Sequence, residues 1–338
     1  MTTSPIEFWH FGRPALTGIE ELATRCESLG FDGMTLTDSQ NLAPDTYVAL
    51  TLAARATSRL LLGTGVTNPL TRHSAVTAGA MASLQEVSAG RAMLGIGRGD
   101  SALFNIGHKP VSPAVLERYV RDVQAYLRGE TLDAAGNPSQ LRWLGDCAQA
   151  KVPLDVAGTG PKVISVGARL ADRVSFALGS DPQRVAWGVE QVRSALGAGQ
   201  PMPSLGLYLN VCVHDDVERA AELVRPGVGI FAHFTGMPGA TRDRVADKDQ
   251  EVFDRIGDYD KAHHGHGDAA HAKAMPVEFI SRFAIIGPAH HCIEKLAELR
   301  ALGIDRFFII GPRPDHFGDE ADAAQARFAE QVVPALRT

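Results

Sequence analysis

The segment from Gly63 to Pro69 carries residue types that can hold a planar ligand against the main chain. An apolar run enters two glycines, the second of which is Gly65, and the polar residues Thr67 and Asn68 follow. Glycine permits backbone conformations and close approaches that larger side chains prevent. At the carboxyl end of a buried strand, such a break predicts a flat backbone surface on which a ring can rest. The alternative is a plain loop between a strand and a helix.

Two further glycine-rich segments can bind polar groups. Gly158-Thr159-Gly160 precedes a predicted helix, with Lys162 in its first turn. Free amides at a helix N-terminus, together with the helix dipole, favour a phosphate. In the other segment, Arg98 and Asp100 alternate with glycines, which predicts a sharply turned polar loop. The alternative for that loop is a solvated segment held by an ion pair between the two side chains.

A third set of residues can move protons. Asp38 and Gln40 follow the predicted second strand, and His10 lies at the end of the first. A carboxylate in a partly dry pocket has its pKa raised, which suits a general acid or base at neutral pH. Asp38, His10 and Gln40 are therefore the candidate catalytic residues. The alternative for Asp38 is a carboxylate that caps its loop or pairs with Arg98.

These segments all follow short apolar runs that alternate with helical patterns along the whole chain. The eight predicted strands are residues 6–11, 31–37, 60–66, 92–97, 153–157, 173–177, 204–213 and 304–310. Eight such units predict a single (β/α)8 barrel domain over residues 1–338, with the reactive groups at the carboxyl ends of the strands. The alternative is an open doubly wound sheet, but its G-x-G-x-x-G fingerprint after the first strand is missing.

A long insertion is predicted at residues 233–276, before the last helix–strand unit. It is rich in glycine, aspartate and histidine and shows little apolar periodicity. An excursion of that length without a core of its own is typically a lid over a binding site or is disordered. His263, His264, His266 and His271 lie within it, but no predicted element fixes their geometry, so no metal site is predicted.

Composition limits the class of protein. The 338 residues are 45% hydrophobic and 21% charged with a net charge of -6, so no basic surface for nucleic acid is expected. No apolar run approaches the roughly 20 residues that span a bilayer, and the polar N-terminus does not resemble a signal peptide. The four cysteines lie far apart, which favours a reducing cytoplasm over a disulfide framework.

Several of these motifs together resemble the bacterial luciferase-like superfamily. The resemblance is closest to its branch of methylenetetrahydromethanopterin reductases and related oxidoreductases of the deazaflavin coenzyme F420. The matching segments are residues 63–73, 95–101, 158–162, 171–173 and 282–288. The resemblance covers nearly the whole chain and implies a barrel of the luciferase-like type.

The resemblance also implies how a cofactor would bind. A non-proline cis peptide forms a bulge behind the isoalloxazine-type ring in that family, and it maps to Gly65-Val66. Thr67, Asn68 and Asp100 would hydrogen-bond the edge of the ring, and residues 158–162 would bind the cofactor phosphate. Several members carry a histidine just after the second strand; here the segment reads Asp38-Ser39-Gln40-Asn41. Asp38 is the best replacement for it.

The implied activity is hydride transfer between F420 and a small organic substrate, in a homodimer. The alternative cofactor is FMN, in a two-component monooxygenase that uses reduced FMN and dioxygen. Since no NAD(P) fingerprint is present, either version needs a separate reductase or a cofactor-reducing dehydrogenase. A third hypothesis is a non-catalytic binding protein on a barrel that has lost its cofactor, which only the missing histidine supports.

Overall fold

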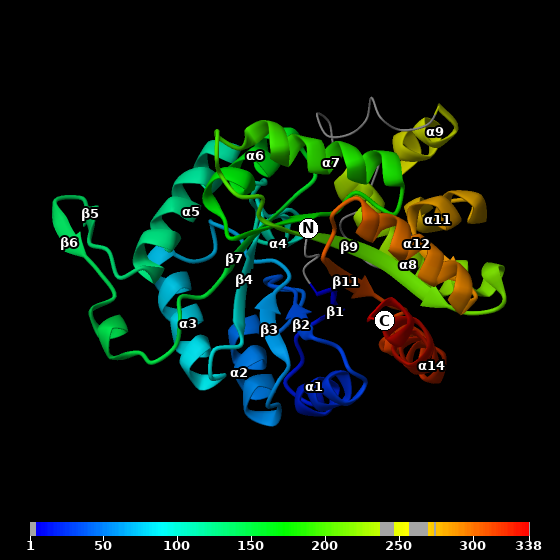
Figure 1. Cartoon of the computed structure of the whole chain (residues 1–338), viewed down its shortest axis with the longest axis horizontal. Coiled ribbons are helices and arrows are strands. Elements are labelled where there is room, and N and C mark those ends of the chain that lie inside the picture. Colours follow the sequence, from blue (N-terminus) through cyan, green and yellow to red (C-terminus); the bar gives the residue numbers. More distant parts are fainter. Residues whose placement is uncertain (1–4, 237–246, 257–269, 274, 338) are drawn as a thin grey trace.

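Eight parallel strands close into a barrel with helices around it (Figure 1). The computed structural model describes residues 5–236, 247–256, 270–273 and 275–337. The ring closes because β11 pairs with both β1 and β9, and β9 pairs with β8. The barrel strands are β1 (Glu7–Gly12), β2 (Gly33–Leu36), β3 (Leu61–Thr64), β4 (Ala92–Ile96), β7 (Leu154–Gly158), β8 (Arg173–Phe176), β9 (Ser204–Val213) and β11 (Arg306–Ile310). The predicted (β/α)8 barrel is confirmed.

Helices that follow the strands cover the outside of the barrel. They are α1 (Ile19–Ser28), α2 (Thr46–Ala56), α3 (Ser74–Val87), α4 (Ser101–Phe104), α5 (Pro113–Leu127), α6 (Pro161–Leu170), α7 (Pro182–Ala195), α12 (Ala289–Ala301), α13 (Pro314–Phe317), α14 (Asp319–Arg327), the π-helical turn η4 (Phe328–Val332) and α15 (Val333–Arg337). Polar side chains begin several of them, as Asp45 and Ser112 do by accepting first-turn amides.

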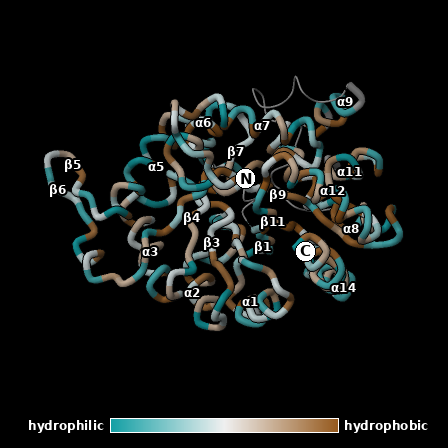
Figure 2. The backbone as a smooth tube through the Cα atoms, viewed as in Figure 1, coloured by the Kyte–Doolittle hydropathy of each residue, from teal (hydrophilic) through white to brown (hydrophobic). Residues whose placement is uncertain are grey.

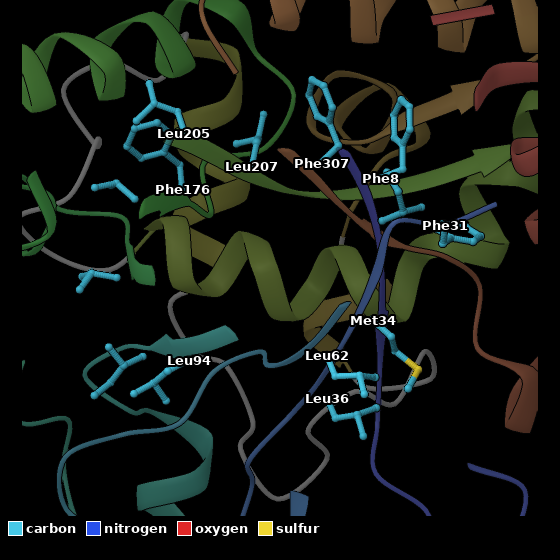
Figure 3. Packing of buried hydrophobic residues seen from close by; sticks show 14 of the residues in the cluster. Phe8, Phe31, Met34, Leu36, Leu62, Leu94, Phe176, Leu205, Leu207 and Phe307 are labelled. Atoms are coloured by element: carbon cyan, nitrogen blue, oxygen red, sulfur yellow. The ribbon is translucent and has the colours of Figure 1, made fainter. Parts of the chain in front are cut away.

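Two layers of apolar side chains hold the barrel together. Outward-facing strand residues, among them Phe8, Leu62 and Leu207, pack against the helices (Figure 3). Figure 2 shows hydrophilic and hydrophobic residues alternating along the peripheral helices, as amphipathic helices require. The second layer fills the barrel, where the rings of Tyr208 and Phe308 stack with centroids 4.3 Å apart. The two layers fix the strands, and hence the loops at their carboxyl ends.

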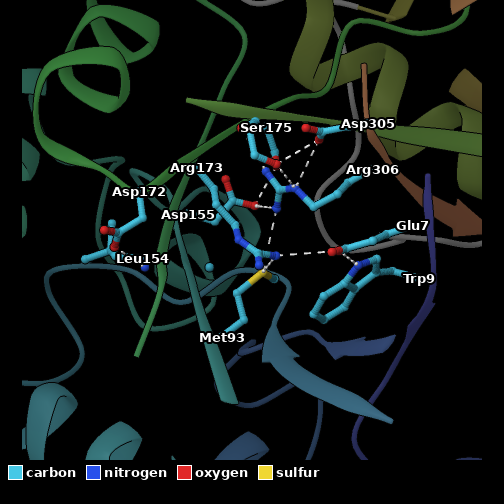
Figure 4. A network of polar contacts seen from close by, with 12 residues as sticks. Glu7, Trp9, Met93, Leu154, Asp155, Asp172, Arg173, Ser175, Asp305 and Arg306 are labelled. Atoms are coloured by element: carbon cyan, nitrogen blue, oxygen red, sulfur yellow. Dashed lines mark hydrogen bonds and ion pairs between the residues drawn. The ribbon is translucent and has the colours of Figure 1, made fainter. Parts of the chain in front are cut away.

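The amino-terminal end of the barrel is filled by a polar network (Figure 4). Arg306 and Asp155 form an ion pair at 3.1 Å with each side chain only 1% exposed. Ser175 donates to the same Asp155 oxygen, and Arg306 also donates to the hydroxyl of Ser204 at 2.9 Å. Since Arg306 and Ser204 are the first residues of β11 and β9, the network lies at the opposite end from the loops that carry the candidate site.

The chain between β9 and β11 holds the insertion. Its described elements are α8 (Val217–Gly236), α9 (Asp247–Ile256), α10 (Ala270–Lys273), α11 (Val277–Phe283) and β10 (Ile285–Gly287), which pairs with the end of β9. The predicted start of the insertion, residue 233, lies within α8. The described turns of α9 bury Val252, Phe253 and Ile256, an apolar pattern that the sequence analysis did not identify.

Two connections contain structure beyond the barrel. The loop after β4 includes the short helix α4, and the link between α5 and β7 contains the hairpin of β5 (Leu132–Ala134) and β6 (Asn137–Ser139) followed by η1 (Arg142–Asp146). Figure 1 shows this hairpin projecting from the body of the molecule at the left. Across the described ranges, no helix combines the length and the apolarity that crossing a membrane requires.

Candidate active site

A bulge interrupts the end of β3. Pairing passes from Gly63 opposite Met93 to Thr67 opposite Ile96, so β3 uses one residue more than β4 over this stretch. The peptide bond between Gly65 and Val66 is cis, as the resemblance implied. Main-chain pairing resumes at Thr67, whose N–H donates to the Gly95 carbonyl at 3.0 Å. The bulge therefore presents main chain at the mouth of the barrel while the two strands stay joined on either side.

Glycines around the bulge make room for the protein itself. A Cβ on Gly95 would lie 2.1 Å from the carbonyl oxygen of Thr64, and one on Gly97 would lie 3.0 Å from Val66. A Cβ on Gly65 would lie 2.8 Å from the hydroxyl of Thr35. The sequence analysis predicted these glycines to allow close approach to the main chain, and the structure shows that segments of the protein itself make part of that approach. Val66, which is half-buried, forms the surface of the bulge.

Asp38, Gln40 and Thr67 are brought together beside the bulge. Asp38 is 4% exposed; one of its oxygens accepts from the Thr67 hydroxyl at 2.6 Å and the other from the Gln40 amide at 2.7 Å. Burial raises the pKa of Asp38 above its usual value, although these hydrogen bonds and the nearby charge of Arg72 oppose the shift. The structure gives this carboxyl group two orienting donors and a raised pKa, the properties of a proton-transfer group.

Asn68 supplies a donor at the same place. Its side chain is 1% exposed, and Oδ1 accepts from the backbone amides of Leu70 and Thr71 at 3.0 and 3.2 Å. Those two bonds fix the orientation of the amide, because only the oxygen can accept them. Nδ2 is buried and finds no hydrogen-bond partner within the described part of the chain. Since buried donors are normally paired, this atom points to a ligand that accepts a hydrogen bond.

Asp100 pairs with a residue that the sequence analysis did not single out. His233 of α8 places Nε2 at 3.3 Å from an Asp100 oxygen, with both side chains less than 15% exposed. Two residues away on α8, the Thr235 hydroxyl donates to the Ala177 carbonyl after β8. Phe231, on the same helix, packs its ring edge-on against Phe11 of β1. The carboxyl-terminal part of α8 therefore extends over the barrel mouth and contacts the loops of several strands.

Arg98 holds the loop after β4 rather than an aspartate. Its Nε donates to the carbonyl oxygen of Val111, and the amide of Val111 donates back to the Arg98 carbonyl at 3.1 Å. The polar loop that begins at Gly97 is thus closed onto Val111, two residues before the start of α5. In the part of the chain that the structure describes, Arg98 pairs with neither Asp38 nor Asp100.

The predicted phosphate cradle has the expected local geometry. Gly158 ends β7, α6 begins at Pro161, and Gly160 is its N-cap with no side-chain hydrogen bond capping the helix among the described residues. A Cβ on Gly158 would lie 2.7 Å from Val163, so only glycine lets the strand turn this closely into the helix. Thr159 is half-buried and Lys162 is exposed at the first turn. The first-turn amides of α6 are therefore available to an anion.

His10 does not join these residues. It lies on the helix-facing side of β1, where Nδ1 is 3.0 Å from the side-chain amide of Gln325 in α14 and the ring packs against Phe31. Burial, and secondarily the charge of Arg25, lowers the pKa of His10 to about 4. The reason is the alternation of the strand: Trp9 faces the barrel interior, so its neighbour faces the helices. We therefore leave His10 out of the site.

The histidine-rich part of the insertion lies outside the described residues. His263, His264 and His266 fall between α9 and α10, and the side chain of His271 is likewise not described. Within the ranges that the structure covers, no group of three or more histidine, cysteine, aspartate or glutamate side chains is placed to hold a metal ion.

Comparison with known proteins identifies the family. A family model described as luciferase-like monooxygenase matches residues 2–306. The chain belongs to the luciferase-like monooxygenase family. It is 27% identical over 304 residues to the 5,10-methylenetetrahydromethanopterin reductase of Methanolobus tindarius, an alignment that covers 88% of this chain and 92% of that protein. The family and the branch suggested by the sequence motifs are confirmed.

Two solved structures of F420-dependent enzymes share the fold of this chain. The coenzyme F420 dependent tetrahydromethanopterin reductase from Methanopyrus kandleri superimposes with a TM-score of 0.79 at 21% identity, covering 98% of this chain and 100% of that one. An F420-dependent secondary alcohol dehydrogenase, solved in complex with an F420–acetone adduct, gives 0.74 at 20% identity over 99% and 100%. At these identities the similarity establishes the luciferase-like barrel and its helices.

Within this luciferase-like barrel, two aromatic residues near Asp38 were missed by the sequence analysis. The Tyr47 hydroxyl is buried without a hydrogen-bond partner in the described residues, and burial raises the pKa of this phenol. The guanidinium of Arg72 lies 4.2 Å from the centre of the Tyr47 ring, and the Tyr119 hydroxyl donates to the Arg72 carbonyl at 2.9 Å. Nothing in the local sequence distinguishes Tyr47 from a core residue of α2.

Proposed function

We propose that this protein is an oxidoreductase that transfers a hydride between deazaflavin coenzyme F420 and a small organic substrate. The observation that carries the proposal is the buried Nδ2 donor of Asn68 beside the cis Gly65–Val66 bulge, with no protein acceptor in the described residues. The reductase and dehydrogenase names of the relatives in the same family branch favour F420.

The residues present fit a ring with a phosphate-bearing tail. The main chain at Gly65 and Val66 would support the ring, Thr67, Asn68 and Asp100 would line its polar edge, and the first turn of α6 would take the phosphate. Two features support this fit: the buried amide donor of Asn68 and the α6 N-terminus, which lacks a side-chain cap in the described part of the chain. Arg98 would act indirectly, by holding the loop that carries Asp100.

When bound, F420 supplies the hydride donor or acceptor, and the protein supplies orientation and a proton. Asp38 holds a proton more readily than an exposed aspartate because burial raises its pKa. Thr67 and Gln40 fix the direction of the carboxyl group through the two hydrogen bonds described above. We therefore assign proton transfer to Asp38, with Gln40 as the residue that positions it.

The alternative function keeps the same site but uses FMN. The description of the family as luciferase-like monooxygenases supports it, since a monooxygenase would use reduced FMN and dioxygen. A non-catalytic barrel is the less favoured third function. The glycines at the bulge fit it as well as the other two, because they are required by contacts within the protein.

Direct binding separates these functions. Purified protein is titrated with F420 and, separately, with FMN, and binding is followed by the absorbance and fluorescence of each cofactor. We expect saturable F420 binding in the micromolar range and much weaker FMN binding. Saturable FMN binding with oxygen consumption, in the absence of F420 binding, would replace the proposal by the monooxygenase. Binding of neither cofactor would leave the non-catalytic barrel.

The substitution Asn68→Asp tests the residue that carries the proposal. It keeps the oxygen that accepts from Leu70 and Thr71 but replaces the Nδ2 donor by an acceptor. A buried polar group left unpaired costs about 1–3 kcal/mol, so we expect the F420 dissociation constant to rise about 10-fold or more. The control Asn137→Asp lies exposed on β6 and should leave the constant unchanged. Equal F420 binding by N68D and wild type would remove Asn68 from the cofactor site.

The proposed function also implies a redox partner, an oligomeric state and a cellular compartment. We propose that a separate reductase or cofactor-reducing dehydrogenase regenerates the cofactor, and that the protein is a cytoplasmic homodimer with a small-molecule substrate. All four cysteines lie in the described residues and are free thiols, which is consistent with a reducing compartment. We also propose that the whole chain is one barrel domain in which residues 233–276 cover the substrate. The contacts of α8 with the strand loops support that role.

A further inference from the structure

Arg184 is a buried guanidinium on the first turn of α7, the helix that follows β8. The residue is 4% exposed, and Nε and Nη2 have no hydrogen-bond partner among the described residues. The guanidinium lies between two aromatic rings, with its carbon 5.3 Å from the centre of Phe253 in α9 and 5.7 Å from that of Phe283 in α11. The rings hold the charged plane by cation–π contact but accept no hydrogen bond in its plane.

Nearby carboxylates are engaged elsewhere. Asp249 of α9 accepts from both Nε and Nη2 of Arg282, with the Nε contact at 3.3 Å. Asp181 is the N-cap of α7 and accepts from the Gln183 amide at 2.8 Å. Burial lowers the pKa of Arg184 to about 10, while the charges of Asp181 and Asp249 oppose that shift. Arg184 is therefore charged at neutral pH, with its Nε and Nη2 donors still open.

The two open donors define the chemistry of the missing partner. Nε–H and Nη2–H lie on one edge of the guanidinium, and that edge matches two oxygens of a carboxylate or a phosphate. α7 is 14 residues long and directs its positive N-terminal end toward the same region, which adds attraction for an anion. A buried charge without a partner is costly, so a neutral or cationic ligand does not explain this arrangement.

We infer that Arg184 binds one anionic group, a carboxylate or a phosphate, of the substrate. This inference rests on the proposed function for its reaction, but the anion site itself does not require F420. The site is distinct from the cradle proposed for the cofactor phosphate, because that cradle is the N-terminus of α6 after β7, and Arg184 follows β8. It lies against Phe253 of α9, which is within the segment proposed to cover the substrate, and against Phe283 of α11, which follows that segment.

The test uses the full chain without cofactor, titrated with inorganic phosphate and, separately, with acetate. Trp187 lies one turn beyond Arg184 on α7, so tryptophan emission reports on the site. We expect saturable emission changes in the wild type and a loss of about 10-fold or more in affinity for Arg184→Gln, because two charge-assisted hydrogen bonds disappear. The matched control Arg193→Gln removes an exposed arginine of the same helix and should bind as wild type does. The tighter probe identifies the anion as phosphate or carboxylate.

Two further variants keep the result decisive. Arg184→Lys retains the charge without the bidentate edge, so it should bind more weakly than wild type even if R184Q folds poorly. Lys162→Gln perturbs the α6 cradle and should leave the Trp187 response in place. The inference is overturned if R184K and R184Q bind phosphate and acetate as wild type does, if K162Q rather than R184Q abolishes the response, or if the wild type shows no saturable response.

F420 titration of the same variants separates the two proposals. We expect R184Q to bind F420 with unchanged affinity, because Arg184 is assigned to the substrate. If R184Q loses anion binding and neither wild type nor any variant binds F420, the anion site is supported and the proposed function is refuted. If wild type binds F420 tightly but shows no emission response to anions, the proposed function is supported and the anion site is refuted.

Discussion

The variant Asp38→Asn is expected to lose about 10²- to 10⁴-fold in kcat, the usual contribution of a positioned proton-transfer group. Asparagine can preserve the local structure: its oxygen can accept from Thr67, and the Gln40 amide can reverse to meet its nitrogen. Turnover is followed by F420 absorbance, with the substrate that a screen of small alcohols, aldehydes and ketones identifies. In the direction of the reaction where Asp38 accepts the proton, the wild-type rate should rise as the pH passes through the raised pKa of Asp38. The pH–rate profile of D38N should lack this rise.

The same substitution should stabilise the protein at neutral pH. Because the folded pKa of Asp38 is raised, its contribution to stability is fully present below the unfolded pKa, about 4, and is lost as pH rises through the folded pKa. The urea concentration at the unfolding midpoint should therefore be higher for D38N than for wild type at pH 7, and the two midpoints should become equal near about pH 3. The control Asp215→Asn lies exposed and should alter neither property. Full activity of D38N would remove Asp38 from proton transfer.

The variant Arg306→Met is expected to cost about 3–5 kcal/mol of folding free energy. It removes one partner of an ion pair whose side chains are each 1% exposed, and so leaves the Asp155 carboxylate charged in the barrel floor. Ser175 would still donate to one Asp155 oxygen, but the other is buried without a hydrogen-bond partner in the described residues, so the carboxylate loses its ion-pair partner with one oxygen unsatisfied. Urea unfolding measures the loss. F420 affinity of the folded fraction should stay near the wild-type value, because the network lies at the far end of the barrel.

The double variant Asp155→Asn, Arg306→Met identifies the cause. Removing the unpaired charge of Asp155 should recover more than half of the folding free energy lost in R306M, since a neutral replacement for a buried ion pair is often tolerated. The control Arg59→Met removes an arginine that is 78% exposed and 4.0 Å from Glu27, so its effect should stay within about 0.5 kcal/mol. A double variant no more stable than R306M would show that packing, and not the unpaired carboxylate, explains the loss.

Local patterns predicted the strands and the glycine break at the end of β3, because both depend on short segments, whereas the bulge was implied by the family resemblance. Each barrel strand is an apolar run flanked by a turn, and the Gly63-to-Asn68 motif carries the glycines that its own contacts require. Asp38 and Thr67 could be placed together because parallel strands bring their carboxyl ends to one edge. His10 was misplaced by one alternation of the strand, a register detail that the residue types alone do not contain.

The remaining site residues depend on contacts between distant segments. His233 reaches Asp100 only because α8 extends over the barrel mouth. The buried guanidinium of Arg184 likewise depends on two rings from distant helices, Phe253 of α9 and Phe283 of α11. Tyr47 is indistinguishable in sequence from the apolar residues of its helix. Helical patterns and glycines in the sequence cannot reveal such contacts, because the contacts depend on how the insertion packs against the barrel.

Gly97, the residue after β4, has a consequence for how this barrel can diversify. A Cβ on Gly97 would lie 3.0 Å from the side chain of Val66, so a larger residue there would press against the β3 bulge. The position of the bulge main chain that would support a ring can thus be changed from the adjacent segment, without altering any residue that would face a bound molecule.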